Sequence, residues 1–370
     1  MYYGRIAKVK KKDKWGLINK AGKIILPIQY DEIGFTYKGY TEIKLNEKWG
    51  LVDSKKIVIP VNYDSINPYF CDLWASAEKD GKWGVVDKTT GKEIITFQYD
   101  FIGDGGKTGN FKVCLNDKWG VVDISENIVV PIQYESIYSD DECIHVKMNN
   151  KWGILDKTGK LIVSCQYDEI SPFKEGVAIV KLNRKYGLID TTGKVIVPIQ
   201  YHIIYNLYRG FARVYQNGKW GIVDTAGKVV VPIEYDQIGD FEEKYVRAKQ
   251  NGKWGVIDSS GKVVVPIEYD QIGDFTEKYA RAKQNGKWGI VDTAGKVVVP
   301  VEYDEIGYFR EKYVRAKQNG KWGVIDSSGK VIVPFQYEDI EPFFQGKAKV
   351  KLNGKWGVID SSGKVIKTFK

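Results

Sequence analysis

Residues 251–270 read NGKWGVIDSSGKVVVPIEYD, a segment that contains two turn signals separated by short runs of apolar residues. The preceding residues 245–250 alternate apolar and polar side chains, and Asn251-Gly252 supplies the two positive-φ positions of a type I′ turn, so 253–257 should return antiparallel. A second turn is predicted from Asp258 to Gly261, and the β-branched stretch 262–265 forms a third strand. Because Pro266 has no N–H to donate, we expect it to end the pairing. The stretch therefore predicts a three-stranded antiparallel unit.

This unit is repeated along the whole chain. The Trp-Gly pair returns every 33–36 residues, and in one unit Tyr replaces Trp. A fixed period of this length indicates a repeat array, whose units must stack on their neighbours to bury their apolar faces. We therefore expect one elongated domain over residues 1–370. Its eleven units are centred on Trp15, Trp49, Trp83, Trp119, Trp152, Tyr186, Trp220, Trp254, Trp288, Trp322 and Trp356.

No helical period of 3.6 residues persists for more than a turn, so the predicted fold class is all-β. We expect eleven three-stranded units of about 34 residues in an open β superhelix, a solenoid-like stack. The alternative is a closed, propeller-like toroid. Propeller blades normally have four strands, and a closed ring usually joins strands from both ends of the chain. The chain begins on a first strand and ends after a third, which favours the open stack.

Three motifs return in register: Lys-Trp-Gly, the Asp-x-x-Gly-Lys turn, and the Pro-x-x-Tyr-Asp segment. With these motifs the chain resembles the WG repeats, also called KWG repeats, which occur mostly in bacterial proteins. The resemblance covers essentially the whole chain and departs from the pattern at Tyr186, Thr96, Ser164 and His202. It implies a repeat scaffold and offers no catalytic residue to transfer.

Composition places further limits on the function. The net charge of +9 is an end effect, since residues 1–12 contribute +5, residues 319–370 contribute +4, and residues 13–318 carry 42 charges of each sign. No apolar run approaches the ~20 residues of a membrane helix, and the N-terminus lacks the apolar stretch of a secretory signal. We therefore expect a cytoplasmic protein, without membrane association, and favour a monomer.

The residues that most often bind metals are few and scattered. His145 and His202 lie far from each other and from any cysteine pair, so no metal site and no cofactor are expected. The cysteines occupy non-equivalent columns of different units, whereas structural disulfides or zinc sites would recur with the unit. We predict free thiols at Cys71, Cys114, Cys143 and Cys165.

Three recurrent columns are assigned structural roles. The Trp of each Lys-Trp-Gly motif should belong to the stacking core, although a regular array of aromatic rings could also stack bases or sugars. The Tyr of each Tyr-Asp segment should form a buried spine. The Asp at the start of each second turn should bond its own backbone, because one carboxylate per turn is too few for a calcium site.

The first strand of each unit carries the most informative polar column. Basic residues two positions apart lie on the same face of a strand. In stacked units they would form a stripe able to meet an acidic protein surface or a phosphate chain, unless nearby acids balance them on a solvated face. The candidate partner-binding stripe consists of Arg213, Arg247, Lys249, Arg281, Lys283, Arg315, Lys317, Lys349 and Lys351.

The sequence contains no nucleophile elbow, no P-loop and no metal-binding motif, so we do not expect an enzyme. The first hypothesis is a non-catalytic repeat scaffold that presents an extended surface to a protein partner. The alternative is a module that binds nucleic acid or another polyanion through the Arg/Lys stripe. Glycan binding by exposed aromatic rings is a third hypothesis, which the missing secretory signal disfavours.

Overall fold

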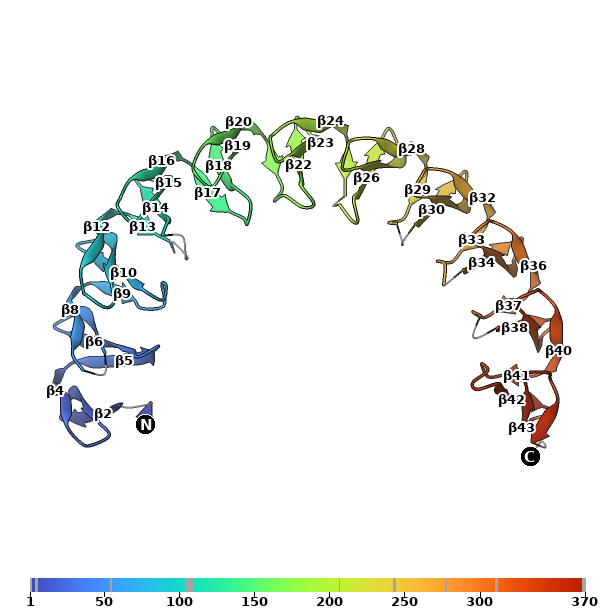
Figure 1. Cartoon of the computed structure of the whole chain (residues 1–370), viewed down its shortest axis with the longest axis horizontal. Helices are drawn as coiled ribbons and strands as arrows, with labels where there is room; N and C mark the ends of the chain where they lie inside the picture. Colours follow the sequence, from blue (N-terminus) through green and yellow to red (C-terminus); the bar gives the residue numbers. More distant parts are fainter. Residues whose placement is uncertain are drawn as a thin grey trace. The chain divides into compact units, whose positions relative to one another are not determined.

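The computed structural model describes residues 2–3, 6–53, 55–103, 109–205, 207–241, 244–276, 278–309 and 312–367. All regular secondary structure in these ranges is β-strand, and the strands form eleven four-stranded sheets that follow one another along the chain (Figure 1). Strand pairing within the sheets is antiparallel. The prediction of an all-β tandem repeat is confirmed.

Each sheet contains four strands that are consecutive in the sequence. The strands of the first five sheets are β1 (Tyr2–Tyr3), β2 (Ile6–Lys11), β3 (Lys14–Asn19), β4 (Ile24–Tyr30); β5 (Glu32–Tyr37), β6 (Tyr40–Leu45), β7 (Lys48–Val52), β8 (Ile57–Tyr63); β9 (Ser65–Asn67), β10 (Trp74–Lys79), β11 (Lys82–Asp87), β12 (Glu93–Tyr99); β13 (Phe101–Ile102), β14 (Phe111–Leu115), β15 (Lys118–Val122), β16 (Ile128–Tyr134); β17 (Ser136–Ser139), β18 (Ile144–Met148), β19 (Lys151–Leu155) and β20 (Leu161–Tyr167).

The remaining sheets repeat the same order with less variation in strand length. Their strands are β21 (Glu169–Ile170), β22 (Val177–Leu182), β23 (Lys185–Asp190), β24 (Val195–Tyr201); β25 (Ile203–Ile204), β26 (Phe211–Gln216), β27 (Lys219–Asp224), β28 (Val229–Tyr235); β29 (Gln237–Ile238), β30 (Tyr245–Gln250), β31 (Lys253–Asp258), β32 (Val263–Tyr269); β33 (Gln271–Ile272), β34 (Tyr279–Gln284), β35 (Lys287–Asp292), β36 (Val297–Tyr303); β37 (Glu305–Ile306), β38 (Tyr313–Gln318), β39 (Lys321–Asp326), β40 (Val331–Tyr337); β41 (Asp339–Ile340), β42 (Lys347–Leu352), β43 (Lys355–Asp360) and β44 (Val365–Lys367).

The central hairpin of the unit forms as the sequence predicts. Strands β30 and β31 pair in register from Tyr245 opposite Asp258 to Gln250 opposite Lys253. Between them Asn251 has φ 51° and Gly252 has φ 79°, both positive as a type I′ turn requires. The right-handed twist of the two strands matches this turn, so an Asn-Gly pair is sufficient to reverse the chain.

Each sheet also contains a fourth strand that the three-stranded unit did not include. The segment after each conserved tyrosine forms a short edge strand, such as β29, in which Gln237 pairs with Lys249 and Ile238 pairs with Ala248. With two residues in most units, this strand is too short to show an alternating pattern of its own. The segment after the tyrosine is therefore part of the next sheet.

The proline does not end the third strand, contrary to the prediction. Pro266 lies inside β32, at the point where the register between β31 and β32 shifts. Trp254 pairs with Tyr269 and Val256 pairs with Val265, so β32 bulges by two residues opposite Gly255. A bulge leaves residues without a ladder partner, which is where a residue lacking N–H is tolerated.

This bulge explains why glycine follows the tryptophan. A Cβ atom on Gly255 would lie 2.6 Å from the carbonyl oxygen of Val265 and 2.6 Å from Cγ1 of Ile267. The glycines after the Trp residues from Trp15 to Trp322 lie against the third strand in the same way, and at Gly221 the corresponding distance to the Val231 oxygen is 2.7 Å. The glycine of the Trp-Gly motif therefore lies at a close contact with the bulged third strand, where a side chain would clash.

The hydrophobic core lies between successive sheets. One cluster combines Ile222, Val231 and Tyr235 of the sheet β25–β28 with Val246 and Ile257 of the sheet β29–β32. Equivalent clusters lie between the consecutive sheets from β1 to β20 and from β21 to β44, so a sheet with two such neighbours contributes to the core on both sides. No unit could bury its apolar residues alone, as the period predicts.

The second turn of each unit sets how closely two sheets approach. Gly261 has φ 87°, and a Cβ atom there would lie 2.2 Å from the carbonyl oxygen of Val230 in the preceding sheet. Gly295 lies in the same way against Val264, with 2.0 Å to the carbonyl oxygen. Glycine is therefore required at this position by both the backbone conformation and the neighbouring sheet.

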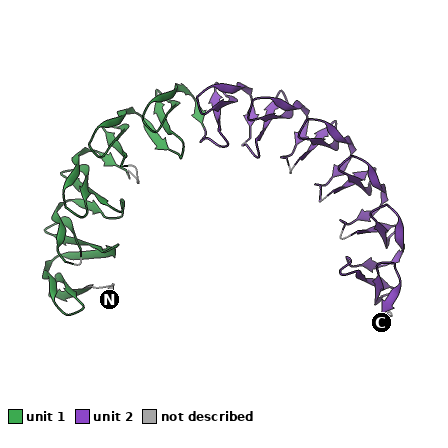
Figure 2. Cartoon of the chain, viewed as in Figure 1, with its two compact units in different colours: residues 1–170 green, residues 171–370 purple. Residues whose placement is uncertain are grey.

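The chain divides into two compact units, Met1–Ile170 and Ser171–Lys370 (Figure 2). Within each unit, consecutive sheets pack on one another, and no strand in the described ranges pairs with a strand of a different sheet. Each of these two compact units is thus an open, solenoid-like row of sheets. The expectation of a single elongated domain over 1–370 stays a prediction.

Candidate functional site

The basic stripe lies at the junctions between sheets and not on an outer face. In β30, Val246 and Ala248 point into the core with the preceding sheet and are buried, whereas Arg247 and Lys249 are half-buried on the opposite side. This opposite side faces the following sheet, whose core cluster includes Tyr245 and Trp254 at its margin. The period-two argument correctly places the basic residues on one face.

The arginines of the stripe connect each sheet to the next. Arg247 Nη1 donates to the carbonyl oxygen of Ile272 at 3.3 Å, and Arg281 Nη1 donates to Ile306 at 3.2 Å. Arg213 and Arg315 make the equivalent bonds, to Ile238 at 3.2 Å and to Ile340 at 2.7 Å. Each acceptor belongs to the short edge strand of the following sheet. These side chains therefore contribute to the stacking of the array as well as to its surface.

Acidic residues of the following sheet neutralise part of the stripe. Arg213 Nε lies 2.9 Å from Asp240 Oδ1, and Arg247 Nε lies 2.5 Å from Asp274 Oδ1. At the next junction Tyr308 replaces the aspartate, and Arg281 Nη2 donates to its hydroxyl at 2.6 Å while the guanidinium lies 3.9 Å above the ring. The charge of the stripe is thus compensated in some junctions and directed at aromatic rings in others.

The lysines of the stripe cover the tryptophans. Lys249 Nζ lies 5.5 Å from the centre of the Trp254 ring, and Lys283 and Lys317 lie 5.4 and 5.6 Å from the rings of their own units. At this distance a cation is attracted to the face of the ring. Lys317 also pairs with Glu305 at 2.8 Å.

The last unit continues the stripe in a more exposed form. Lys349 takes the place of an arginine, is 63% exposed, and lies 3.5 Å from Glu341. Lys351 occupies the lysine column and is half-buried. All nine predicted stripe residues therefore lie on the same side of their sheets, with partners that differ from junction to junction.

The tryptophan column lies at the margin of the core and not in its centre, which corrects the prediction. The Trp residues of the repeats are half-buried and pack against the clusters from one side, and Trp356 is 40% exposed. The tyrosines opposite them, such as Tyr235 and Tyr269, are buried and form the predicted spine. The Trp ring therefore has one face on the core and one face on the stripe.

The aspartate of the second turn acts as the sequence predicts. Asp258 Oδ1 accepts bonds from the Ser260 N–H at 2.9 Å, the Ser260 hydroxyl at 2.6 Å and the Lys262 N–H at 3.0 Å. The hydroxyl bond is the main cause that lowers the pKa of Asp258, although burial opposes it. The carboxylate is occupied by its own turn.

Two departures from the repeat pattern have local explanations. The Lys of the Trp-Gly motif normally pairs with the Asp after the spine tyrosine, as in Lys253–Asp270 at 2.5 Å. Where His202 replaces that Asp, Lys185 Nζ lies 2.7 Å from its Nε2. Thr96 stands in the proline position and uses the N–H that proline lacks to bond Glu126 at 2.9 Å.

Two grooves in the unit Ser171–Lys370 open between sheets along the stripe. The larger, about 590 Å³, is lined by Arg281, Tyr308, Arg315, Trp322 and Phe343, among others. The smaller, about 390 Å³, contains two arginines of the stripe and their two aspartates, and its wall is completed by Tyr245 and Phe275. Aromatic rings and charges of both signs therefore share the same surface.

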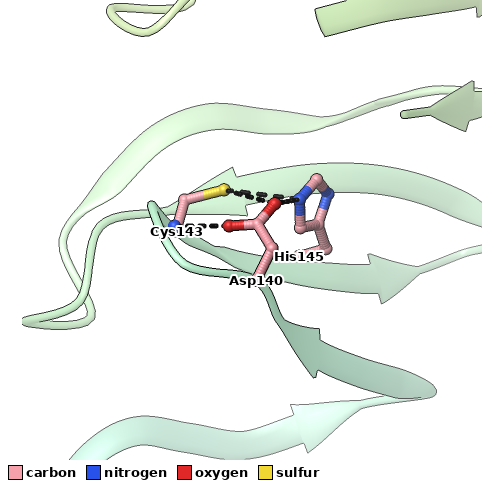
Figure 3. A group of neighbouring side chains, drawn as sticks. All are labelled: Asp140, Cys143 and His145. Carbon is pink, nitrogen blue, oxygen red and sulfur yellow. Dashed lines mark hydrogen bonds and ion pairs between the residues drawn. The ribbon is translucent and has the colours of Figure 1, made fainter. Parts of the chain in front are cut away.

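A second site, missed by the sequence analysis, lies in the sheet β17–β20. Asp140, Cys143 and His145 bring a carboxylate, a thiol and an imidazole together, all within 4.8 Å of one another (Figure 3). His145 is fully buried, and its ring stacks on Tyr138 with 4.3 Å between the ring centres. In the sequence, His145 has no second cysteine or histidine at a usual metal-ligand spacing, so the motif search does not point to it.

The sequence does contain a signal for this group. His145 stands in the column that holds Arg247 in the regular units, and Cys143 stands where those units have Tyr245. The interval from Trp119 to Trp152 is also 33 residues, the shortest in the array. Unusual polar residues in a shortened repeat would have identified the group.

The electrostatics of this group follow from burial and short contacts. Burial is the largest influence on Asp140 and opposes ionisation, but hydrogen bonds from the Cys143 N–H, His145 and the Glu142 N–H together lower its pKa to about 2. Burial, together with the negative charge of Asp140, raises the pKa of Cys143 to about 12. The group therefore holds a carboxylate beside a protonated thiol.

The remaining predictions concern disulfides and membranes. All four cysteines are free, as predicted. No helix that could cross a lipid bilayer occurs in the described ranges.

Solved structures similar to this chain have low sequence identity. A eukaryotic initiation factor is 10% identical, with TM-score 0.28, covering 100% of this chain and 98% of its own. PorZ of the Porphyromonas gingivalis type-IX secretion system is 8% identical, with TM-score 0.24, covering 96% and 72%. Hsv2p of Kluyveromyces lactis is 9% identical, with TM-score 0.21, covering 71% and 91%. No curated protein sequence matches the chain.

The family profile described as "WG containing repeat" matches the chain ten times without interruption. The matched segments are residues 15–49, 50–83, 83–119, 119–152, 152–186, 186–220, 220–254, 254–288, 288–322 and 322–356. The segments run from one Trp-Gly motif to the next. In the unit of Trp254 this motif lies opposite the β-bulge of the third strand. The chain therefore belongs to the WG repeat family.

Proposed function

We propose that this protein is a non-catalytic repeat scaffold that binds a protein partner along the grooves between its sheets. The observation that carries the proposal is the lining of the two grooves in the unit Ser171–Lys370, where aromatic rings, guanidinium groups and carboxylates lie together. Protein interfaces are enriched in aromatic residues and arginine, while their charges are paired across the contact. This mixture fits a polypeptide segment.

The alternative, a polyanion-binding module, has less support from the same surface. Binding of nucleic acid requires a surplus of positive charge facing the phosphates. Here Arg213 and Arg247 already pair with Asp240 and Asp274, and Lys317 pairs with Glu305. Phosphates would have to displace these carboxylates, so we expect only weak binding, due mainly to the N-terminal lysines.

The experiment compares two charge-matched variants. In the groove variant Arg247, Arg281 and Arg315 become Glu, and in the control variant the exposed turn lysines Lys262, Lys296 and Lys330 become Glu in the same repeats. Both variants change the net charge equally. Each is used as bait in the native host beside the wild-type chain, and bound proteins are identified by mass spectrometry.

A partner retained by the wild-type chain and the control variant but lost from the groove variant supports the proposal. Because the arginines also connect sheets, Tyr308→Ala is tested in parallel; this side chain is 49% exposed and lines the larger groove, and its removal deletes the Arg281–Tyr308 contact but keeps the bond from Arg281 Nη1 to the Ile306 carbonyl oxygen. Labelled single- and double-stranded nucleic acid is titrated in the same series. Submicromolar binding at physiological salt that the groove variant loses would overturn the protein-scaffold reading.

A further inference from the structure

The geometry of Asp140, Cys143 and His145 points to a metal site. We propose that these three side chains bind one Zn²⁺ ion in the sheet β17–β20, with Asp140 Oδ2, Cys143 Sγ and His145 Nε2 as ligands. These are the three donor types that zinc takes in proteins. The site is independent of the grooves on which the proposed scaffold function rests.

The distances between the donor atoms suit a single ion. Cys143 Sγ lies 3.3 Å from His145 Nε2 and 3.7 Å from Asp140 Oδ2, and Asp140 Oδ2 lies 2.8 Å from His145 Nε2. With zinc bonds of ~2.0–2.3 Å, tetrahedral ligand atoms lie about 3.3–3.8 Å apart. Two of the three distances already match. The third is shorter because the carboxylate and the imidazole are hydrogen-bonded to each other in the absence of an ion.

The surroundings hold the three donors in place. Asp140 Oδ1 accepts the N–H groups of Glu142 at 2.9 Å and Cys143 at 2.8 Å, which leaves Oδ2 directed at the other two ligands. Stacking on Tyr138 fixes the plane of the His145 ring. Its second nitrogen, Nδ1, is buried and has no hydrogen-bond partner in the described part of the chain, so the stacking takes over the orienting role that an outer hydrogen bond has in other sites.

The charges of such a site balance. Zinc displaces the thiol proton of Cys143, which is released to solvent, while the imidazole proton moves from Nε2 to Nδ1. One thiolate and one carboxylate then neutralise the two charges of the ion. A neutral assembly is what a buried site tolerates. Asp140, 18% exposed, is the most exposed of the three ligands, so a water molecule in the fourth position would lie on its side of the ion.

The first measurement uses the full chain, free of any affinity tag and kept reduced. Equilibrium dialysis against Zn²⁺ should give one tightly bound ion per chain, and Co²⁺ should produce the near-ultraviolet charge-transfer absorption of a cobalt–thiolate bond. Absence of a bound ion at micromolar Zn²⁺, or a cobalt spectrum without the thiolate band, would overturn the proposal.

Variants assign the ligands. Cys143→Ser should remove the thiolate band and weaken zinc binding by more than the ~10–100-fold that loss of an outer-shell partner costs. The matched control is Cys165→Ser, a half-buried thiol in the same sheet with no carboxylate or imidazole bonded to it in the described structure. If Cys143→Ser fails to fold, Asp140→Asn is compared with Asp141→Asn, its exposed neighbour. Equal zinc affinity in the two members of either pair overturns the assignment.

Discussion

At the residue scale, each Trp-Gly pair joins two requirements of the unit. The tryptophan covers the margin of the core, and in units such as that of Trp254 its outer face lies under a lysine, while the glycine makes room for the bulge of the third strand. Sequence alone identifies the pair as structural, because its glycine is present in every unit. It does not show that the ring stays half-exposed, since this depends on how far the next sheet extends.

The close contact between Gly255 and the bulged strand β32 predicts that one added methyl group will destabilise the fold. Gly255→Ala places Cβ 2.6 Å from the Val265 carbonyl oxygen, so the free energy of unfolding should fall by about 1–3 kcal/mol, as overpacking does. Gly273→Ala is the control, because its nearest atom beyond the chain neighbours is 3.7 Å away, and it should change stability by less than about 0.5 kcal/mol. Urea unfolding measures both. Equal losses of stability in the two variants would show that the close contact with β32 is not the reason for glycine at position 255.

The position of the two aromatic columns predicts an order of stability loss. Tyr269 is buried, so Tyr269→Ala should cost about 3–5 kcal/mol, as removal of a buried ring does. Trp254 is half-buried, and Trp254→Ala should cost roughly half as much. Urea titrations with a fluorescence-independent signal, such as circular dichroism, give both values. A larger loss for Trp254→Ala would return the tryptophans to the centre of the core.

At the scale of the element, the hairpin is what the sequence specifies best. Alternation in 245–250 and the Asn251-Gly252 turn fix both strands and their register. The edge strand β29 escapes sequence reasoning, because its two residues gain their pairing only from the following hairpin. The continuation of β32 past Pro266 escapes it for a similar reason: the bulge that tolerates proline is created by the partner strand.

The turn aspartates predict a dependence of stability on pH. Hydrogen bonds lower the pKa of Asp258 and Asp326 below the ordinary value of 3.8 in the folded state. A lowered folded pKa stabilises the protein above the unfolded pKa, and this contribution is lost as the pH falls through the folded pKa. The urea midpoint should therefore decrease as the pH drops below about 4.

Substitution tests whether these turns are the cause. The double variant Asp258→Asn, Asp326→Asn should show a shallower decrease of the urea midpoint between about pH 4 and pH 2. The control is Asp13→Asn, which changes an exposed aspartate of a different turn. The explanation fails if the double variant and the control have the same acid dependence as the wild type.

At the scale of the whole molecule, the repeat period predicts the array, but not the site in β17–β20. Equivalent residues make equivalent contacts, so one unit is enough to predict most of the others. His145 and Cys143 replace the usual residues of their columns, and they meet Asp140 in a repeat that is shorter than the others, so no other unit predicts this group. The basic stripe is intermediate: its face follows from period two, whereas the acids that neutralise it belong to the next sheet.

Contacts limited to neighbouring sheets predict that one repeat can be removed. Deleting residues 254–287 joins Lys253 to Trp288 and leaves every motif in register. The shortened chain should fold, and the denaturant m-value should fall by about a tenth, in proportion to the surface exposed on unfolding. Deleting residues 254–270 instead removes β31 and β32 and should abolish cooperative unfolding. Loss of folding in the full-repeat deletion would show that distant sheets depend on one another.

The local pairing of every strand also determines how the chain should respond to tension. A force on the two ends would separate the strands of one sheet in succession, like a zipper, while the other sheets stay intact. Single-molecule extension should then show a series of low, similar force peaks, each releasing about 110 Å of chain, the extended length of one 34-residue repeat. A protein built in this way would lengthen in even steps under load and recover each step separately.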